Sequence, residues 1–286
     1  MNTQRTPLFC DADLAERIER VETQLIEATA RAAHRRLGDD RGFLIPVAGG
    51  IASFATDDSP FNKVVGLGFS GVPTADELDE IEHAYAAVGA PVQVELPHLA
   101  DPDIGIALSR RGYRLESFEN VLGIVVEAEY DVTLPDGIEV RPSADEELAV
   151  WLDMMADAVA VPDTQGVPWR EEFPRDTYIE AERDAASADI IRYIAMLNDE
   201  IAGGAGLRTA EGVAQFAGAA TLPAHRRHGI QSALLSTRLS DAATAGCDIG
   251  VITTQPASRS QQNAQRSGFD LLYTRAVLVK HTDRAI

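Results

Sequence analysis

The sequence predicts a mixed α/β fold in which one unit of strands and helices occurs twice. Segments with strand-like patterns alternate with segments that carry apolar residues at helical spacing, from about residue 14 to residue 279. The two halves also end in the same way, with a glycine and an aromatic residue between a predicted helix and a predicted strand. These residues are Gly112 and Tyr113 in the first half and Gly268 and Phe269 in the second. We interpret this correspondence as an internal duplication with a period far longer than that of solenoid repeats.

The first half is predicted to begin with a long amphipathic helix over residues 14–36, where Ile18, Val21 and Leu25 recur at helical spacing. Thr74 is expected to cap a helix over residues 75–88, because Glu77 stands where a capping-box partner belongs. The remaining expected elements are strands at 43–47, 51–55, 63–69, 92–96 and 115–126 and a helix at 104–111.

Residues 127–137 have the composition of a linker with a turn, since they include Pro135, Asp136 and Gly137. We therefore expect two domains, at residues 1–130 and 138–286. In the second we expect strands at 138–141, 190–197, 201–208, 213–222, 249–253 and 271–279, and helices at 144–159, 169–186, 230–245 and 258–266.

Composition excludes several classes of function. The chain carries 25 basic and 45 acidic residues, for a net charge of −20. This balance argues against nucleic acid and against an anionic membrane surface as partners, whereas a cationic amine remains a suitable substrate. Cys10 and Cys247 form no disulfide framework, and the N-terminus lacks a secretory pattern, so a cytoplasmic location is expected.

The most informative segment is a basic turn, residues 225–229, placed between a predicted strand and a predicted helix. It contains two arginines, two histidines and Gly229, in an otherwise acidic chain. The first N–H groups of a helix and the positive end of its dipole favour anions at the same place. The turn therefore predicts a ligand that carries several phosphates.

Residues 213–279 resemble the cofactor half of a GCN5-related N-acetyltransferase (GNAT). The family's turn, Arg/Gln-x-x-Gly-x-Gly/Ala, matches Arg226-Arg-His-Gly-Ile-Gln231, and Gln231 stands where Gly or Ala is common. The resemblance implies two GNAT-like domains in tandem and strands that separate after Leu222, with acetyl-CoA as co-substrate in the gap. The implied cofactor-binding residues are Thr221, Leu222, Arg226, Arg227, His228, Gly229, Ile230, Gln231, Ser232, Ala233 and Asn263.

The catalytic residues are less clearly marked. Many relatives use a Tyr acid and a Glu base where this chain has Ala264 and Gln215. Tyr273, or a hydroxyl such as that of Ser260, is the predicted substitute acid, although half-buried sheet packing is the favoured interpretation of Tyr273. The acidic residues of the 169–186 helix could recognise an amine, although a solvated helix face is the favoured interpretation. These acidic residues are Glu171, Glu172, Asp176, Glu180 and Glu182. The six histidines lack metal-binding spacing, so no metal is expected.

Gly66, Gly68 and Gly71 match the spacing of a dinucleotide loop. Pro73 and Thr74 delay the following helix beyond the last glycine, which favours a plain glycine-rich turn. Because this turn lacks the arginine pattern, we expect the first half to be a degenerate copy. Such a copy would not bind acetyl-CoA and would form one wall of the substrate cleft.

These observations predict an N-acetyltransferase that is active in its C-terminal domain and transfers acetyl from acetyl-CoA to a small-molecule amine. The alternative is a catalytically silent acyl-CoA sensor, which the missing Tyr and Glu favour; a structural protein is a third reading. The sequence does not identify the acceptor. It also leaves the oligomeric state open, with a homodimer among the alternatives.

Overall fold

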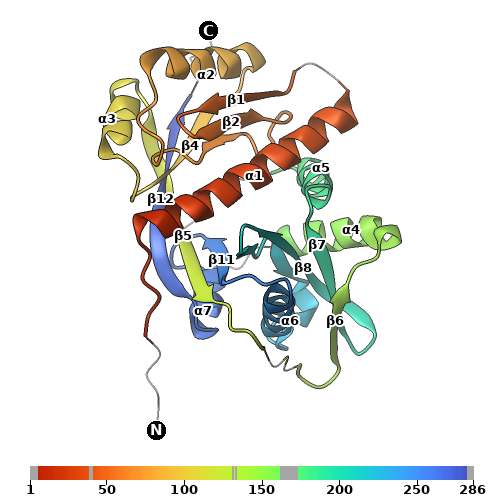
Figure 1. The fold of residues 1–286 in the computed structure, drawn as a ribbon. Coiled ribbons are helices and arrows are strands. Elements are labelled where there is room, and N and C mark those ends of the chain that lie inside the picture. Colours follow the sequence, from red (N-terminus) through yellow and green to blue (C-terminus); the bar gives the residue numbers. More distant parts are fainter. Residues whose placement is uncertain (1–5, 39–40, 131, 133, 162–172, 282–286) are drawn as a thin grey trace.

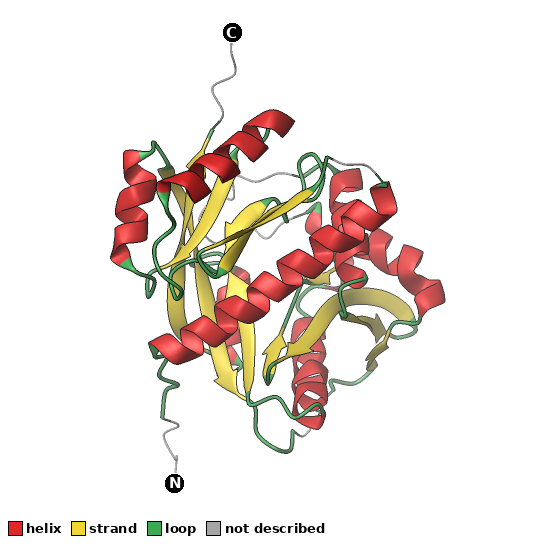
Figure 2. Cartoon of the chain, turned by 45° about the horizontal axis from the view of Figure 1, so that its top comes forward, coloured by secondary structure: helices red, strands yellow, loops and turns green. Residues whose placement is uncertain are grey.

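In the residues that the structure describes, a sheet of twelve strands runs through the molecule and has helices on both faces (Figures 1 and 2). The structure, a computed structural model, describes residues 6–38, 41–130, 132, 134–161 and 173–281. In this part of the chain the strand order is β1-β2-β3-β4-β12-β5-β11-β9-β8-β7-β6, and β10 pairs with β8 beside that path. None of the helices in these residues is long and apolar enough to cross a membrane.

The first half starts with the long helix α1, which crosses the sheet diagonally in Figure 1. The helix begins where the Asp11 side chain accepts a hydrogen bond from the Leu14 N–H, and it ends at Gly38, whose φ is 66°. Its apolar face packs against the central strands of the sheet. The elements are α1 (Ala12–Leu37), β1 (Phe43–Val47), β2 (Gly50–Phe54), β3 (Lys63–Val65), α2 (Ala75–Val88), β4 (Val92–Pro97), α3 (Pro102–Arg110) and β5 (Arg114–Val125).

In the described residues of the second half, a strand and two helices precede the repeated unit, and the two helices pack against each other. The first of these helices is preceded by a short 3-10 turn, Asp145–Glu147. The elements are β6 (Ile138–Pro142), α4 (Leu148–Val159), α5 (Arg175–Ala186), β7 (Ile191–Leu197), β8 (Glu200–Ala210), β9 (Val213–Gln215), β10 (Ala219–Thr221), α6 (Ile230–Thr244), β11 (Ile249–Thr254), α7 (Arg259–Arg266) and β12 (Asp270–Lys280).

The two halves repeat one arrangement. Strands β1, β2, β3 and β4 correspond to β7, β8, β9 and β11: three consecutive antiparallel strands, the third of which pairs in parallel with the fourth. Helices α3 and α7 end in the same turn, in which Gly112 and Gly268 have φ of 89° and 94°. The next N–H, of Tyr113 or Phe269, bonds to a carbonyl five residues earlier. The predicted duplication is present in the fold.

The halves share strands at the centre of the sheet. Strand β5 belongs to the first half in sequence, but it pairs antiparallel with β11 and β12 of the second. Strand β12, the last of the chain, pairs with β4 of the first half as well as with β5. Neither half therefore completes its own sheet. The domain boundary between residues 130 and 138 stays a prediction.

Four segments differ from the sequence prediction by four or more residues. The helix expected at 144–159 begins at Leu148, because the chain first forms the 3-10 turn Asp145–Glu147. The strand expected at 63–69 ends at Val65, because Gly66 takes a φ of 77° and turns the chain. The strand expected at 213–222 divides into β9 and β10, with Gly218 at φ 39° between them. The helix expected from residue 169 begins at Arg175, and residues 169–172 lie outside the described part of the chain.

Candidate functional site

The break between β9 and β10 opens the sheet of the second half. Strand β9 pairs in parallel with β11, and the Phe216 N–H continues that pairing with a 2.9 Å bond to the Val251 carbonyl. The chain then turns at Gly218, and β10 pairs with β8 instead, with Ala219 opposite Ala205. The strand that leads to the basic turn thus separates from β11, as the sequence resemblance implies.

Helix α6 begins directly after the basic turn without a capping side chain. Its N-cap is Gly229, with φ 90°, and the Ala233 N–H makes a 3.0 Å bond to the Gly229 carbonyl. The N–H groups of Ile230, Gln231 and Ser232 have no intrahelical acceptor, because they occupy the first helical turn. A Cβ at residue 229 would lie 2.9 Å from Cγ of Pro135, which packs over the turn. These free donors make an anion-binding helix end.

The basic side chains of the turn have different surroundings. Arg226 donates hydrogen bonds to the carbonyl oxygens of Thr221, Ala158 and Val161, so its guanidinium fixes the turn to the end of α4. Arg227, with φ 68°, is exposed beside the helix end, and so is His228. Arg227 and His228 are therefore the predicted basic residues that face solvent at the helix end.

The other predicted cofactor residues surround the same helix end or lie on α7. The Gln231 amide donates a 2.9 Å hydrogen bond to the Thr221 hydroxyl, which joins α6 to β10. Ile230 and Ala233 are buried in the core, whereas Ser232 is exposed. Leu222 and Asn263 are half-buried, Asn263 on the helix whose Ala264 packs in the core. Their roles toward the cofactor stay predictions.

The corresponding helix end of the first half, at α2, is closed by its own side chains. The Thr74 hydroxyl accepts from the Glu77 N–H, and the Glu77 carboxylate accepts from the Thr74 N–H at 2.7 Å. The hydrogen bonds from Thr74 lower the pKa of Glu77, which keeps its negative charge at the helix start. The glycine-rich loop before it is also filled, because a Cβ at residue 68 would lie 2.1 Å from Cβ of Ala100.

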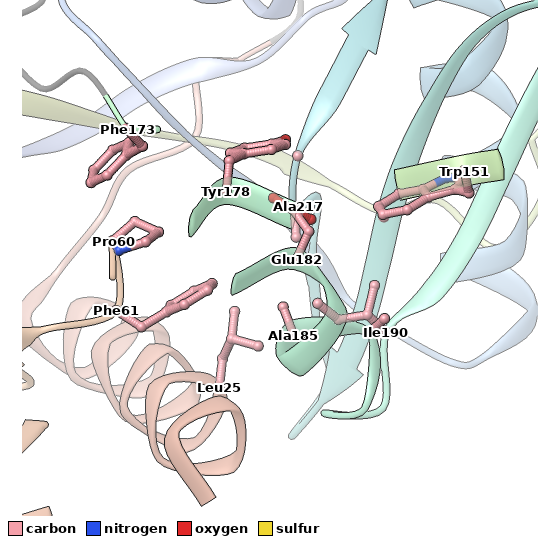
Figure 3. A pocket seen from close by; sticks show the side chains of 13 residues that line it. Leu25, Pro60, Phe61, Trp151, Phe173, Tyr178, Glu182, Ala185, Ile190 and Ala217 are labelled. Carbon is pink, nitrogen blue, oxygen red and sulfur yellow. The ribbon is translucent and has the colours of Figure 1, made fainter. Parts of the chain in front are cut away.

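A pocket of about 260 Å³ lies between the two halves, beside the break in the strand (Figure 3). The first half contributes Leu25 of α1 and Phe61 of the loop before β3. The second half contributes α5, Ala217 and Gly218. Among the described residues, two side chains with titratable groups line the pocket, Tyr178 and Glu182, and the other lining residues are apolar or small.

Glu182 is the carboxyl side chain that the described residues contribute to this pocket, and the sequence interpretation as a solvated helix face is wrong for it. Its Oε1 lies 3.9 Å from the position that a Cβ would take at Gly218. Burial raises the pKa of Glu182 from 4.5 to about 7, while a hydrogen bond with Tyr178 acts in the opposite direction. Glu182 and Tyr178 are four residues apart, which places them on one face of α5.

Other acidic residues of this region have different positions. Glu180 forms an ion pair with Arg36 of α1, and Asp176 is exposed at the start of α5. Glu171 and Glu172 lie outside the described residues. The described part of the chain contains no group of three or more His, Cys, Asp or Glu side chains arranged to hold a metal ion.

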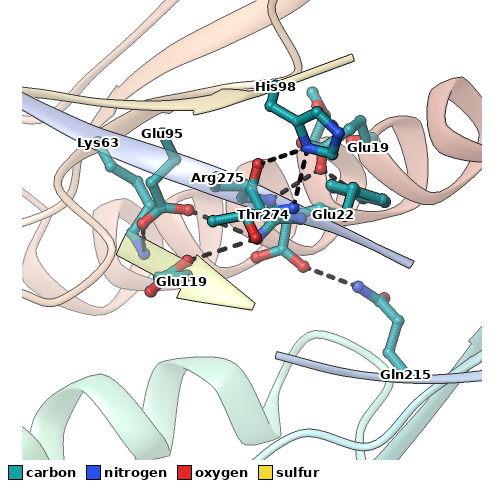
Figure 4. Close-up of polar contacts among 11 residues, drawn as sticks. Glu19, Glu22, Lys63, Glu95, His98, Glu119, Gln215, Thr274 and Arg275 are labelled. Atoms are coloured by element: carbon teal, nitrogen blue, oxygen red, sulfur yellow. Dashed lines mark hydrogen bonds and ion pairs between the residues drawn. The ribbon is translucent and has the colours of Figure 1, made fainter. Parts of the chain in front are cut away.

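A buried cluster of charges occupies the space between α1 and the central strands (Figure 4). At its centre Arg275 donates a 2.8 Å hydrogen bond to Glu19, and its guanidinium lies 3.7 Å from carboxylate oxygens of both Glu95 and Glu119. Lys63 binds Glu95 at 2.5 Å. These contacts hold charges of both signs inside the protein, where ions without partners would be costly.

The predicted acid Tyr273 lies in this cluster. Its side chain is 1% exposed, and its hydroxyl donates a 2.6 Å hydrogen bond to Glu19. Burial raises the pKa of Tyr273 well above 10, and the Glu19 carboxylate acts in the same direction. Tyr273 is absent from the lining of the pocket in the described part of the chain, so its assignment as the acid stays a prediction.

The fold and the site together define the class of the protein. It has a duplicated α/β fold, and in one of the two units the strands separate beside a helix that begins without a capping side chain. Comparison with known families agrees, because residues 155–269 match the model of the Acetyltransferase (GNAT) family. That segment is therefore similar to the GNAT family, and the chain as a whole has the fold of a tandem GNAT protein. The family resemblance of the basic turn is therefore confirmed.

Two solved structures illustrate the likeness. The GCN5-related N-acetyltransferase from Kribbella flavida is 19% identical, with a TM-score of 0.63, covering 90% of this chain and 97% of that chain. A tandem GNAT protein from the clavulanic acid biosynthesis pathway is 10% identical, with a TM-score of 0.58, covering 96% of this chain and 97% of that chain. A search of curated proteins found no match.

Proposed function

We propose that this chain is an N-acetyltransferase that transfers the acetyl group of acetyl-CoA to the amine of a small molecule, with the C-terminal half active. The contrast between two corresponding helices carries this proposal. Helix α6 starts at Gly229 without a capping side chain, whereas α2 is capped by Thr74 and Glu77. An open helix end can bind a pyrophosphate, and a helix end already occupied by a carboxylate cannot.

In this proposal the N–H groups of Ile230, Gln231 and Ser232 bind the pyrophosphate, with Arg227 and His228 adding positive charge. The backbone of β10 that faces the gap beside β11 binds the extended arm of the cofactor through its peptide groups. This places the thioester near the break at Ala217 and Gly218. The pocket between the halves then opens where the acetyl group ends.

A charge placed at the third position of α6 tests the proposed cofactor site. Ser232→Glu gives α6 the residue that α2 has at the same position, Glu77. A carboxylate suits a helix start, so the variant is expected to fold, but it repels a phosphate at the same donors. We expect the Kd for acetyl-CoA to rise at least ten-fold, about 1.4 kcal/mol.

The matched control is Ser232→Gln, which has nearly the same shape without the charge. Acetyl-CoA at about one hundred times its Kd should stabilise the native protein and the control by about 2.7 kcal/mol, a thermal shift of several degrees. The Ser232→Glu variant should show a much smaller shift at the same concentration. Equal thermal shifts for both variants would show that acetyl-CoA does not bind at the start of α6.

The alternative, a silent acyl-CoA sensor, is favoured by Ala264 and Gln215 at the usual acid and base positions. Thiol release from acetyl-CoA, measured with a panel of amines, separates the two functions. Release that depends on an amine excludes the sensor. Binding of acetyl-CoA without release for any of a chemically diverse panel supports the sensor.

A further inference from the structure

Among the described residues, the pocket between the two halves is lined by aromatic side chains and by the carboxyl group of Glu182. We infer that it binds a small primary amine with an aromatic body and that Glu182 is the base that deprotonates this amine. This inference rests on the proposed acetyl transfer and assigns the acceptor and the base that the cofactor site leaves open.

The position of Glu182 supports the first step. Ala217 and Gly218, which form the break between β9 and β10, line the pocket, and Glu182 Oε1 lies 3.9 Å from the Cβ position at Gly218. The break is the place where β10 leaves β11 and where the proposed thioester ends. A carboxylate at this place is within reach of a nitrogen that attacks the acetyl carbon.

The walls of the pocket define the body of the amine. Aromatic side chains from both halves line it, Phe61 from the first and Trp151, Phe173 and Tyr178 from the second (Figure 3). Aromatic rings pack favourably on aromatic rings, and their faces attract an ammonium group. A volume of about 260 Å³ accommodates a molecule of about the size of phenylethylamine or tryptamine.

The surroundings of Glu182 suit a base that works near neutral pH. In the part of the chain that the structure describes, Tyr178 and Glu182 are the titratable residues that line the pocket. Burial raises the pKa of Glu182 to about 7, so this carboxyl group can accept and release a proton near neutral pH. The sequence alone could not assign Glu182 to a pocket, because Leu25 and Phe61, which line the same pocket, lie more than a hundred residues away in the sequence.

The reaction balances without any other reactant. The Glu182 carboxylate takes one proton from the bound ammonium group, and the free amine attacks the acetyl carbonyl carbon. The C–N bond forms and the C–S bond of the thioester breaks. The second proton, lost from the nitrogen, goes to the leaving thiolate, which becomes the thiol of CoA. Glu182 then returns its proton to solvent.

The first test is thiol release with phenylethylamine and tryptamine, compared with the polar amines glucosamine and spermidine. We expect kcat/KM for the aromatic amines to be at least a hundred-fold higher. Glu182→Gln should lower kcat by roughly 10²–10⁴-fold and should remove the limb of the pH profile near pH 7. The limb that belongs to the amine itself, at higher pH, should remain. Asp176→Asn, an exposed change on the same helix, is the control.

A second variant, Phe61→Ala, tests the same pocket if Glu182→Gln fails to fold. Phe61→Ala removes one aromatic wall at a half-buried loop position, and it should raise KM for tryptamine about ten-fold without changing the Kd for acetyl-CoA. Acetyl-CoA binding without turnover of aromatic amines, or an unchanged pH profile in Glu182→Gln, would overturn this inference alone. Loss of acetyl-CoA binding in the native protein would overturn the proposed function as well.

Discussion

At the scale of single residues, Glu119 on β5 shows how the buried charges affect stability. Burial raises the pKa of its carboxyl from 4.5 to about 7, the Glu95 carboxylate acts in the same direction, and Lys63 and Arg275 oppose them. Between these two pH values the folded protein holds a proton that the unfolded chain releases. Stability contributed by the protonated form is therefore complete below pH 4.5 and is lost as the pH rises to 7.

Replacing this carboxyl by an amide tests the effect. Glu119→Gln keeps a neutral group at all pH values. The free energy of unfolding of the variant, relative to that of the native protein, should therefore increase by up to about 3 kcal/mol from pH 4.5 to pH 7. Urea unfolding at a series of pH values measures the difference. The exposed Glu146→Gln serves as the control. A constant difference across this range would contradict the raised pKa.

Glu182 and Ser232 also show how far sequence can predict a site. The basic turn and the start of α6 could be predicted, because an anion site at a helix end depends on adjacent residues only. Glu182 lies in a helix whose other acidic residues contact α1 or solvent, and its spacing alone does not separate these faces. The strand break at Gly218 was missed because residues 213–222 are strand-like throughout, and the pairing of β10 with β8 decides the break.

At the scale of elements, helix α1 holds α5 in place. Arg36 donates two hydrogen bonds to the buried carboxylate of Asp184, at 2.8 and 2.7 Å, and also contacts Glu180. Tyr178 and Glu182 project from the other side of α5 into the pocket (Figure 3). The first half therefore affects the proposed acceptor site by positioning α5, as well as by lining the pocket.

Arg36→Met tests this positioning role. It leaves the Asp184 carboxylate buried without its partner, so we expect a loss of about 3 kcal/mol in the free energy of unfolding. KM for the acceptor should rise, because α5 carries Tyr178 and Glu182, while the Kd for acetyl-CoA should not change. Arg31→Met, which removes an exposed ion pair with Glu27 on α1, should cost at most about 1 kcal/mol. An equal decrease in the free energy of unfolding of the two variants would show that Arg36 does not stabilise the position of α5.

Helices could be predicted accurately from the sequence where capping residues mark both of their ends. Helix α2 spans residues 75–88 as expected, since Thr74, Glu77 and Gly89 fix both of its ends. Strand partners are different, because a strand pattern shows which face is buried and not which strand lies beside it. The pairing of β5 with β11 and of β12 with β4 could not be read from either half of the sequence.

At the scale of the whole molecule, this exchange of strands joins the two halves. Strand β5 lies between β11 and β12, and β12 lies between β4 and β5, so removing either half leaves open edges along the strands of the other. Helix α1 adds to the joint, because Ala15, Ile18 and Val21 pack in one cluster with Val213 and Val251. We expect the chain to unfold in one cooperative transition.

Cutting the chain between its halves tests this arrangement. A protease site inserted after the exposed Glu129 allows cleavage of the folded protein in the predicted linker. The two fragments should remain together in size-exclusion chromatography and keep one thermal transition, because strand pairing holds them without a covalent link. Each fragment expressed alone should aggregate or remain unfolded, since its central strands lack partners. Fragments that separate after cleavage and fold independently would show that each half completes its own sheet, contrary to the exchanged strands.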